Sequence, residues 1–359
     1  MPTIGWTATF VTGAWLAASL PASAAGVEVT NYEVTKEFEG AHATDLSGIA
    51  CVPLNQGEYR CLVIDDESKF AQLAKIENGA IEAKAKIRLI KKEDDPKPLG
   101  KKPSVACPNG MDDFAEFDGE GVAYAAPYFY VVGSHGCSRK SGKFRLSSFI
   151  LARIRVDDSG RPVDANGDVL DKDDMEGAVV ETTYRVSDLL RRADTVGESF
   201  GKSLNIDDNG LNIEGITVDG DHVFFGLRAP VDGMAYIVEG SVSALFAPGH
   251  DSLPEGPIQV PIPVPMGNKV GIRDLALLSD DKLLILAGAA FQPDIPYSIF
   301  LLDLKEKATS ELVPQRQDQP TRAEGIALLS STPQEIRVLI LFDKALNGVP
   351  QELRIHLSH

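Results

Sequence analysis

Five short segments of the sequence carry polar or charged side chains just before a glycine or an equivalent residue. These side chains are Asp45 and Ser47, Asp118 and Glu120, Asn212 and Glu214, Arg273 alone, and Arg322 and Glu324. Residues two apart project to the same side of a β-strand, so each pair presents two polar groups in one direction. Carboxylates arranged in this way can coordinate a hard metal ion, transfer protons or hold arginines.

A second group of polar residues stands at the ends of the strand-like runs that follow four of these segments. It consists of Asp65 and Asp66, Ser134 and His135, Arg228, and Asp343. When two consecutive strands run in opposite directions, the start of the first and the end of the second lie at the same edge. We therefore expect both groups to gather around one opening.

A ring of carboxylates needs compensating charge, because two like charges about 8 Å apart cost roughly 2 kcal/mol at an effective dielectric constant near 20. Arginines, protonation or a bound cation can supply it, and oxygen ligands suit calcium. We expect Ca²⁺ as the cofactor, with ligands among Asp118, Glu120, Glu214 and Glu324.

The arginines of these segments favour a small anionic molecule as the partner of the same opening. Its expected ligands are Arg228, Arg273, Arg322, Asp45 and Asn212. Candidate catalytic groups, which would position water or transfer a proton, are Glu120, Glu214, Glu324 and His135.

Structural interpretations compete with these roles. Each glycine with its aliphatic neighbour also fits close packing of inner strands, with the acidic side chain bonded only to backbone N–H groups. His135 also fits an ordinary surface histidine. Asp164-x-Asn166-x-Asp168 resembles the start of an EF-hand loop but lacks its glycine and final glutamate, so we interpret it as a polar hairpin loop.

Short β-strands must position these residues. Each motif opens a unit of four runs with strand-like alternation, but the last unit is one strand short. The unpaired N-terminal run Val27–Phe38 can supply that strand, an exchange that removes a free edge in β-propellers. We predict an all-β propeller of five four-stranded blades, closed by the N-terminal strand joining the C-terminal blade. A sixth blade between Gly121 and Gly215 is the alternative.

The first 24 residues contain no charged side chain, carry an apolar segment and end in Ala22-Ser23-Ala24. They predict a signal peptide at residues 1–24, a single propeller domain at residues 25–359, and a periplasmic or secreted protein without a membrane span after cleavage. An uncleaved hydrophobic anchor is the alternative, because the segment lacks Lys and Arg.

The four cysteines suit an oxidising compartment. Cys51 and Cys61 flank a turn-rich link between two strand-like runs, so we expect them to pair, which leaves Cys107 for Cys137. A metal site is the alternative, although no C-x-x-C spacing exists. The net charge of −17 argues against nucleic acid as a partner. No nucleophile elbow, H-E-x-x-H, Walker or dinucleotide motif is present in the sequence.

The motifs as a set resemble a bacterial family known as domain of unknown function thirty-six sixteen, within a wider group of phytase-like and esterase-like β-propellers. The resemblance covers nearly the whole chain after residue 24, and the run from Asn209 to Gly215 is its most specific part. It implies an exported propeller. Its phytase-like relatives imply calcium-assisted hydrolysis of phosphate esters, although phytases resemble six-bladed propellers.

Three functions follow from these observations. The first is a calcium-dependent hydrolase of phosphate esters or other anionic substrates. The alternative is a non-catalytic periplasmic propeller that binds a ligand or a peptide at the same opening. A glycosidase using Glu120 and Glu214 is the third, disfavoured because the chain has no tryptophan after the first 24 residues to stack on sugars.

Overall fold

The computed structural model describes residues 24–38, 44–55, 57–105, 107–170, 175–256, 259–291, 295–317 and 319–358. The predicted signal peptide lies outside these residues except for Ala24, so its cleavage stays a prediction. Within the described ranges, no helix is long and apolar enough to cross a membrane.

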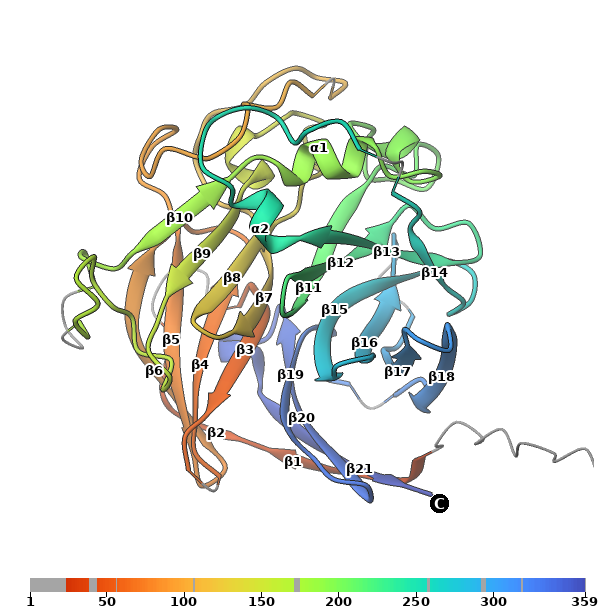
Figure 1. The fold of residues 1–359 in the computed structure, drawn as a ribbon. Coiled ribbons are helices and arrows are strands. Elements are labelled where there is room, and N and C mark those ends of the chain that lie inside the picture. The colour runs from red at the N-terminus through yellow and green to blue at the C-terminus, as the bar shows by residue number, and fades with distance from the viewer. Residues whose placement is uncertain are drawn as a thin grey trace, which may run out of the picture.

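Five β-sheets surround a common centre as the blades of a propeller (Figure 1). The first blade contains β3 (Leu46–Pro53), β4 (Tyr59–Asp65), β5 (Phe70–Glu77) and β6 (Ala80–Arg88). The second contains β7 (Gly119–Ala125), β8 (Tyr128–Gly133), β9 (Leu151–Arg155) and β10 (Val180–Thr183). The third contains β11 (Asn212–Asp219), β12 (His222–Ala229), β13 (Ala235–Ser241) and β14 (Ile262–Val264). The predicted strand order is confirmed in all three.

The fourth and fifth blades complete the ring. The fourth contains β15 (Val270–Ser279), β16 (Lys282–Ala289), β17 (Ser298–Asp303) and β18 (Ala308–Val313). The fifth contains β19 (Arg322–Ser331), β20 (Glu335–Asp343), β21 (Gln351–Leu357) and, as its outer strand, the N-terminal β1 (Ala24–Asn31). The prediction of five blades is thus confirmed, and the long interval before β11 holds loops and short helices instead of a sixth blade.

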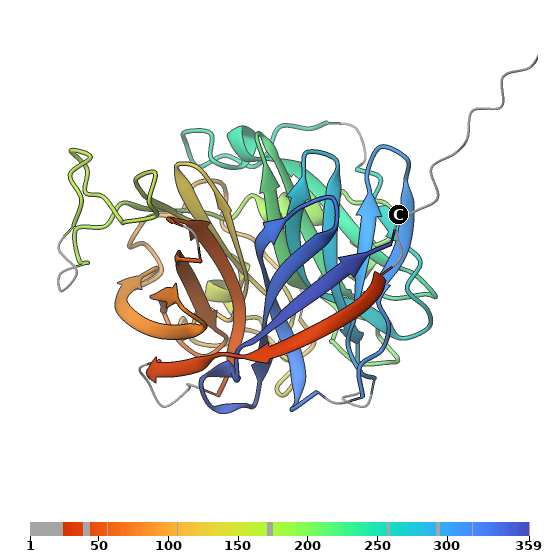
Figure 2. The ribbon, with the colours of Figure 1, turned by 90° about the horizontal axis from the view of Figure 1, so that it is seen from below.

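The N-terminal strand closes the ring as predicted, but it does more than that. β1 pairs antiparallel with β21 and covers its free edge, as Figure 2 shows along the outside of the fifth blade. The chain continues through Tyr32, and β2 (Glu33–Lys36) pairs in parallel with β6 of the first blade. The hydroxyl of Tyr32 donates to Glu352 at 2.5 Å, and Arg337 holds the same carboxylate through two hydrogen bonds. One short segment therefore fastens two blades.

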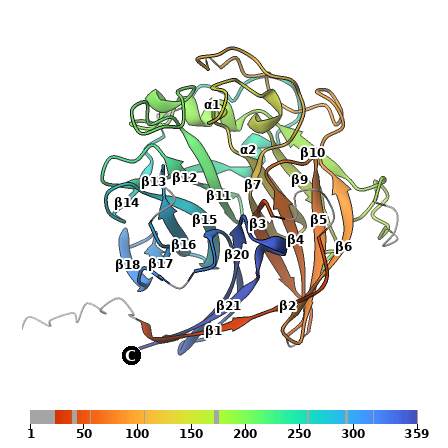
Figure 3. The same cartoon turned by 180° about the vertical axis from the view of Figure 1, so that it is seen from behind.

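The hydrophobic core lies between the blades. Each of the five apolar clusters in the described chain joins two neighbouring blades. Both faces of a blade are covered in this way, which explains why the inner strands are apolar on both sides. The outermost strands lie at the rim (Figure 3). β14 is the last strand of its sheet, so the missing N–H of Pro263 deprives no further strand of a hydrogen bond.

Glycines allow the five inner strands to approach one another at the centre. A Cβ atom added to Gly48 would lie 2.9 Å from the Cα atom of Gly121, and one added to Gly121 would lie 3.0 Å from the Glu214 carbonyl oxygen. In the fourth blade Asp274 takes the glycine position, where its carboxylate accepts the N–H groups of Leu275 at 2.8 Å and Ile326 at 2.9 Å. The structural interpretation of the glycines is therefore correct, and it leaves the preceding side chains free for another role.

Short helices and two disulfides fix the loops. The helices are η1 (Leu146–Phe149), α1 (Val186–Arg191), η2 (Gly197–Ser199), α2 (Val242–Leu245) and η3 (Leu346–Gly348). Both predicted disulfides are confirmed, Cys51–Cys61 across β3 and β4, and Cys107–Cys137 between two loops. The carboxylate of Asp164 accepts backbone N–H groups of its own loop at 2.8 and 2.9 Å, as expected for a polar hairpin.

Candidate functional site

A β-bulge recurs at the same place in all five inner strands. The strand pairing skips the one residue before each glycine or its equivalent, and these skipped residues are Ser47, Glu120, Glu214, Arg273 and Glu324. A bulge redirects the side chain of the extra residue and is common next to functional sites. Here it directs one side chain from each blade into a shared central cavity.

The cavity has a volume of about 430 Å³ and a lining that is mostly polar. Both predicted groups of residues meet in it, since the ends of the second strands contribute Asp66, Ser134, Arg228 and Asp343. Among the candidate site residues the lining includes Asp118, Glu120, Asn212, Glu214, Arg228, Arg273, Arg322 and Glu324. Asp45 and His135 lie outside it.

Blades three to five supply what we call the arginine half of the cavity. Arg228 donates to Glu214 at 2.6 Å, and Arg273 lies 3.0 Å from the other oxygen of Glu214 while also pairing with Glu324. Arg322 lies 3.8 Å from Glu324 and donates to Asp343 at 2.5 Å. These arginines were expected to face an anionic ligand, but their charges are largely balanced by carboxylates of the protein.

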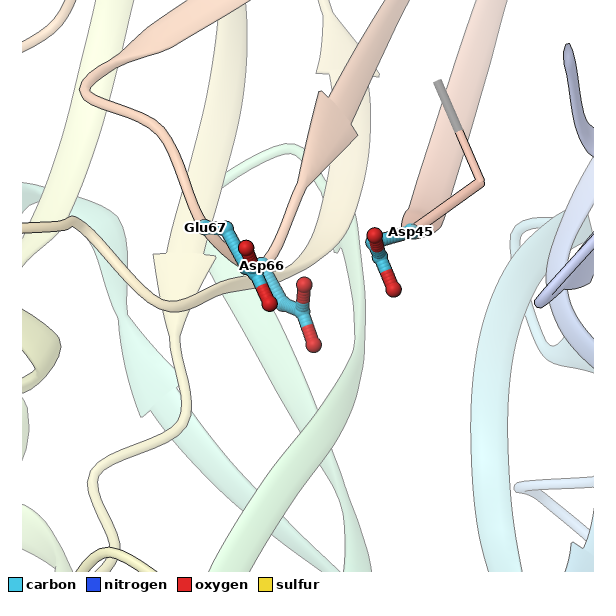
Figure 4. Close-up of side chains that lie close together, drawn as sticks. All are labelled: Asp45, Asp66 and Glu67. Atoms are coloured by element: carbon cyan, nitrogen blue, oxygen red, sulfur yellow. The ribbon is translucent and has the colours of Figure 1, made fainter. Parts of the chain in front are cut away.

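Blades one and two supply what we call the acidic half, formed by Asp66, Asp118 and Glu120. Asp118 accepts a hydrogen bond from Ser134, and none of the three carboxylates forms an ion pair with a described residue. Asp66 also belongs to a cluster with Asp45 and Glu67, whose ligand atoms lie within 4.8 Å of one another (Figure 4). In that cluster Asp45 pairs with Lys344 and accepts a hydrogen bond from Thr44 at 2.9 Å.

The two halves differ in the ionisation of their carboxyl groups. Although burial opposes ionisation, Arg273 and Arg228 hold the pKa of Glu214 at about 2. Burial raises the pKa of Glu324 to about 7, against the opposing effect of Arg273. In the acidic half, burial and neighbouring carboxylates raise the pKa of Asp66 to about 8 and that of Glu120 well above its usual range. Burial likewise raises the pKa of Asp118 to about 6, against the hydrogen bond from Ser134.

His135 is fully buried behind the cavity wall. Its Nδ1 atom lies 2.8 Å from the carbonyl oxygen of Gly133, and its ring packs against Phe149 with the centroids 5.6 Å apart. Burial lowers its pKa to about 4, so the ring is neutral at ordinary pH. In this position it has no access to a ligand in the cavity.

Four buried polar atoms of cavity residues have no hydrogen-bond partner among the described residues: Asp66 Oδ1, Arg145 Nε, Asn212 Oδ1 and Arg273 Nη1. The most deeply buried of these residues are Asn212, 4% exposed, and Arg273, 3% exposed. A buried polar group left without a partner costs about 1–3 kcal/mol. Such groups are typical of a site that is completed by water or a ligand.

Sequence reasoning missed four cations of the lining, of which Arg145 pairs with Glu116. Lys344 follows the predicted Asp343, and Arg139 and Lys140 follow Cys137 in the loop after β8. The available signal was the pair Arg139-Lys140, two residues after Cys137, because a disulfide at Cys137 holds this pair near the end of β8. Asp66 was recognised at that edge but was not chosen as a ligand.

Together these groups form a site for electrostatic and acid–base chemistry. Glu214 stays ionised beside its arginines, whereas Glu324 exchanges a proton near neutral pH. Pairs of carboxyl groups whose environments separate their pKa values are characteristic of proton-transfer sites. The carboxyl groups of the acidic half and the Asn212 amide oxygen line the same cavity, and calcium prefers oxygen ligands of these kinds.

Comparison with solved structures returns matches at low similarity. Hydrazine synthase from Kuenenia stuttgartiensis has a TM-score of 0.36 and 8% identity, over 86% of this chain and 58% of that one. The exo-β-1,3-galactanase 1,3Gal43A from Clostridium thermocellum has a TM-score of 0.43 and 11% identity, over 92% and 63%. A protein of unknown function from Dyadobacter fermentans has a TM-score of 0.41 and 11% identity, over 93% and 99%. This chain thus spans about three fifths of the first two, and similarity at this level supports no activity or ligand.

A search of curated proteins with the sequence finds no match. The family described as "Protein of unknown function (DUF3616)" matches residues 82–353, which is most of the chain and includes four of the five bulge residues. The chain belongs to this family.

Proposed function

We propose that this chain is an exported, calcium-dependent hydrolase of phosphate esters or related small anionic substrates. The observation that carries the proposal is the division of one cavity into an acidic half, whose three carboxyl groups form no ion pair with a described residue, and an arginine half with balanced charge. Two disulfides support export to an oxidising compartment, periplasmic or extracellular.

The acidic half fits calcium by its chemistry. Asp66, Asp118 and Glu120 would hold the ion, with the Asn212 oxygen as a further acceptor in the same cavity. Glu214 and Glu324, expected as ligands from the sequence, are engaged by arginines and are assigned other roles. A bound Ca²⁺ would neutralise the charge of a phosphate group and polarise its P–O bonds.

The arginine half then orients the substrate and moves a proton. The unpartnered Nη1 atom of Arg273 is available for an anionic oxygen, while Glu214 fixes the guanidinium groups of Arg228 and Arg273. Glu324 is the group best suited to accept a proton from water, because its pKa of about 7 lies near the operating pH.

The test is a panel of chromogenic substrates with and without Ca²⁺. Aryl phosphate monoesters and diesters, aryl acetate and aryl glycosides are compared for the wild type, Glu120→Gln, Glu324→Gln and the exposed control Glu198→Gln. We expect calcium-dependent turnover of a phosphate ester, lost in Glu120→Gln and lowered about 100-fold in Glu324→Gln, with the control unchanged.

Other outcomes separate the alternatives. Turnover of a glycoside that is independent of Ca²⁺ would replace the phosphoesterase by a glycosidase. No turnover of any substrate, combined with stabilisation by an anionic ligand, would assign the non-catalytic binding propeller.

A further inference from the structure

One loop at the cavity carries two cations that form no ion pair with a described residue. This loop, Cys137–Lys143, is called the basic loop below. It follows β8, and its residues Ser138, Arg139, Lys140 and Ser141 line the cavity. The side chains of Arg139 and Lys140 are exposed, so they are accessible to a ligand that enters.

The basic loop is firmly held. The Cys107–Cys137 disulfide joins its first residue to another loop, and a turn closes it through Ser138 N–H to Lys143 O at 2.9 Å and Gly142 N–H to Ser138 O at 2.7 Å. The side chain of Asn109, two residues after Cys107, donates to Ser141 O at 2.6 Å. Gly142 has a φ of +64°, which an L residue rarely adopts. The loop therefore presents its side chains from a fixed position.

Its two cations differ from every other cation of the lining. Arg145, Arg228, Arg273, Arg322 and Lys344 each form an ion pair with a carboxylate. Within the described ranges, Arg139 and Lys140 form none. An arginine already paired with a carboxylate has little charge left to attract an anion, whereas an unpaired cation retains it.

We propose that the basic loop selects the substrate, with Arg139 and Lys140 binding the outer oxygens of a doubly charged phosphate monoester. This inference rests on the proposed function and deepens it by naming the substrate class. Two unpaired cations together with Ca²⁺ match a dianion better than the single charge of a phosphate diester. They also attract anions locally to a protein whose net charge is −17.

The position of the loop depends on its disulfide. Besides Cys107–Cys137, the loop is held by the hydrogen bonds of the turn and of Asn109, by a β-bridge between Cys137 and Ser203, and by the ion pair of Lys143 with Asp112. Loss of the disulfide removes the covalent part of this support, so affinity for the ligand should fall. The second disulfide, Cys51–Cys61, lies within the first blade and provides a matched control.

The test measures binding by isothermal titration calorimetry in the presence of Ca²⁺. The probes are phenylphosphonate, a dianion, and its methyl monoester, a monoanion of similar shape. Arg139→Gln and Lys140→Gln should each weaken phenylphosphonate binding about tenfold and the monoanion less. Lys143→Gln is the control, because Lys143 is in the same loop but lies 3.6 Å from Asp112 and outside the lining. It should bind both probes as the wild type does.

The cysteine variants extend the test. Cys107→Ala/Cys137→Ala should lose affinity as the arginine and lysine variants do, and Cys51→Ala/Cys61→Ala should keep it, with folding of each checked by circular dichroism. Unchanged affinity in Arg139→Gln and Lys140→Gln, while Glu120→Gln abolishes binding, would overturn the role of the loop and leave the proposed function standing. A wild type that binds neither probe would overturn both.

Discussion

Replacing Arg273 with methionine removes the cation shared by Glu214 and Glu324. Arg273 is 3% exposed, and its Nη2 atom lies 3.0 Å from Glu214 Oε2. At that separation a charge pair is worth about 5 kcal/mol at an effective dielectric constant near 20. In the variant, Arg228 still pairs with Glu214 and Arg322 still lies near Glu324, so both carboxylates keep part of their charge compensation. We expect a loss of about 4 kcal/mol in the free energy of unfolding at pH 8, as for other broken buried pairs.

The loss should depend on pH. In the wild type the pKa of Glu214 is lowered to about 2, so the stabilisation is complete above its unfolded pKa near 4.5 and disappears as the pH falls towards 2. At pH 5 Glu324 is already protonated, because its pKa is about 7, so Arg273 then balances only Glu214, which Arg228 still pairs in the variant. We therefore expect the loss to shrink to about 1–2 kcal/mol at pH 5.

Urea unfolding at pH 8 and pH 5 measures both values. The control is Arg161→Met, because the Arg161 side chain is 53% exposed and its ion pair with Asp157 at 2.7 Å is worth under about 1 kcal/mol. A loss in Arg273→Met that is equal at the two pH values would refute the reasoning, since it would show that packing, and not charge balance, determines the effect.

Three further predictions concern the frame of the site. Gly121→Ala should destabilise by about 3 kcal/mol in thermal unfolding, because its Cβ would meet the backbone of β11, whereas Gly26→Ala, with open space around it, should be nearly neutral. The wild type should lose about 2 kcal/mol of stability between pH 7.5 and pH 5, because the folded pKa of His135, about 4, lies below its unfolded value near 6.5, so the unfolded state binds the proton first. His135→Leu should not show this loss. Stability curves that run parallel for the two proteins over this pH range would contradict the prediction. Deleting residues 25–31 should lower the melting temperature and cause aggregation visible by light scattering, because the edge of β21 becomes free; an unchanged melting temperature would show that β1 is dispensable.

Most of the fold could be predicted from the sequence because it depends on local patterns. Alternation of apolar residues gives the strands, and the glycines before Ile49, Val122 and Ile216 mark where inner strands meet. The shortage of one strand in the last unit predicts the closure by β1. The pairing of β2 with β6 was not predicted, since Tyr32, which separates β1 from β2, is held by Glu352 and Arg337 from the far end of the chain.

The site was predicted in place but not in detail. Strand direction brings the two groups of polar residues to one edge, and the structure places most of them in one cavity. Which carboxylate pairs with which arginine depends on side chains from different blades, so Arg273 bridging Glu214 and Glu324 has no signal in the sequence. The burial of His135 depends on Phe149, which lies in the short helix η1.

Calcium binding tests the central claim most directly. Titration of the purified protein with Ca²⁺, followed by calorimetry and by the melting temperature, should show binding in the wild type and in the exposed control Glu198→Gln. At a calcium concentration 100 times the dissociation constant, the expected stabilisation is about 2.7 kcal/mol. Asp66→Asn and Glu120→Gln should each lose it. No heat of binding and an unchanged melting temperature in the wild type would contradict the assignment of the acidic half as a calcium site.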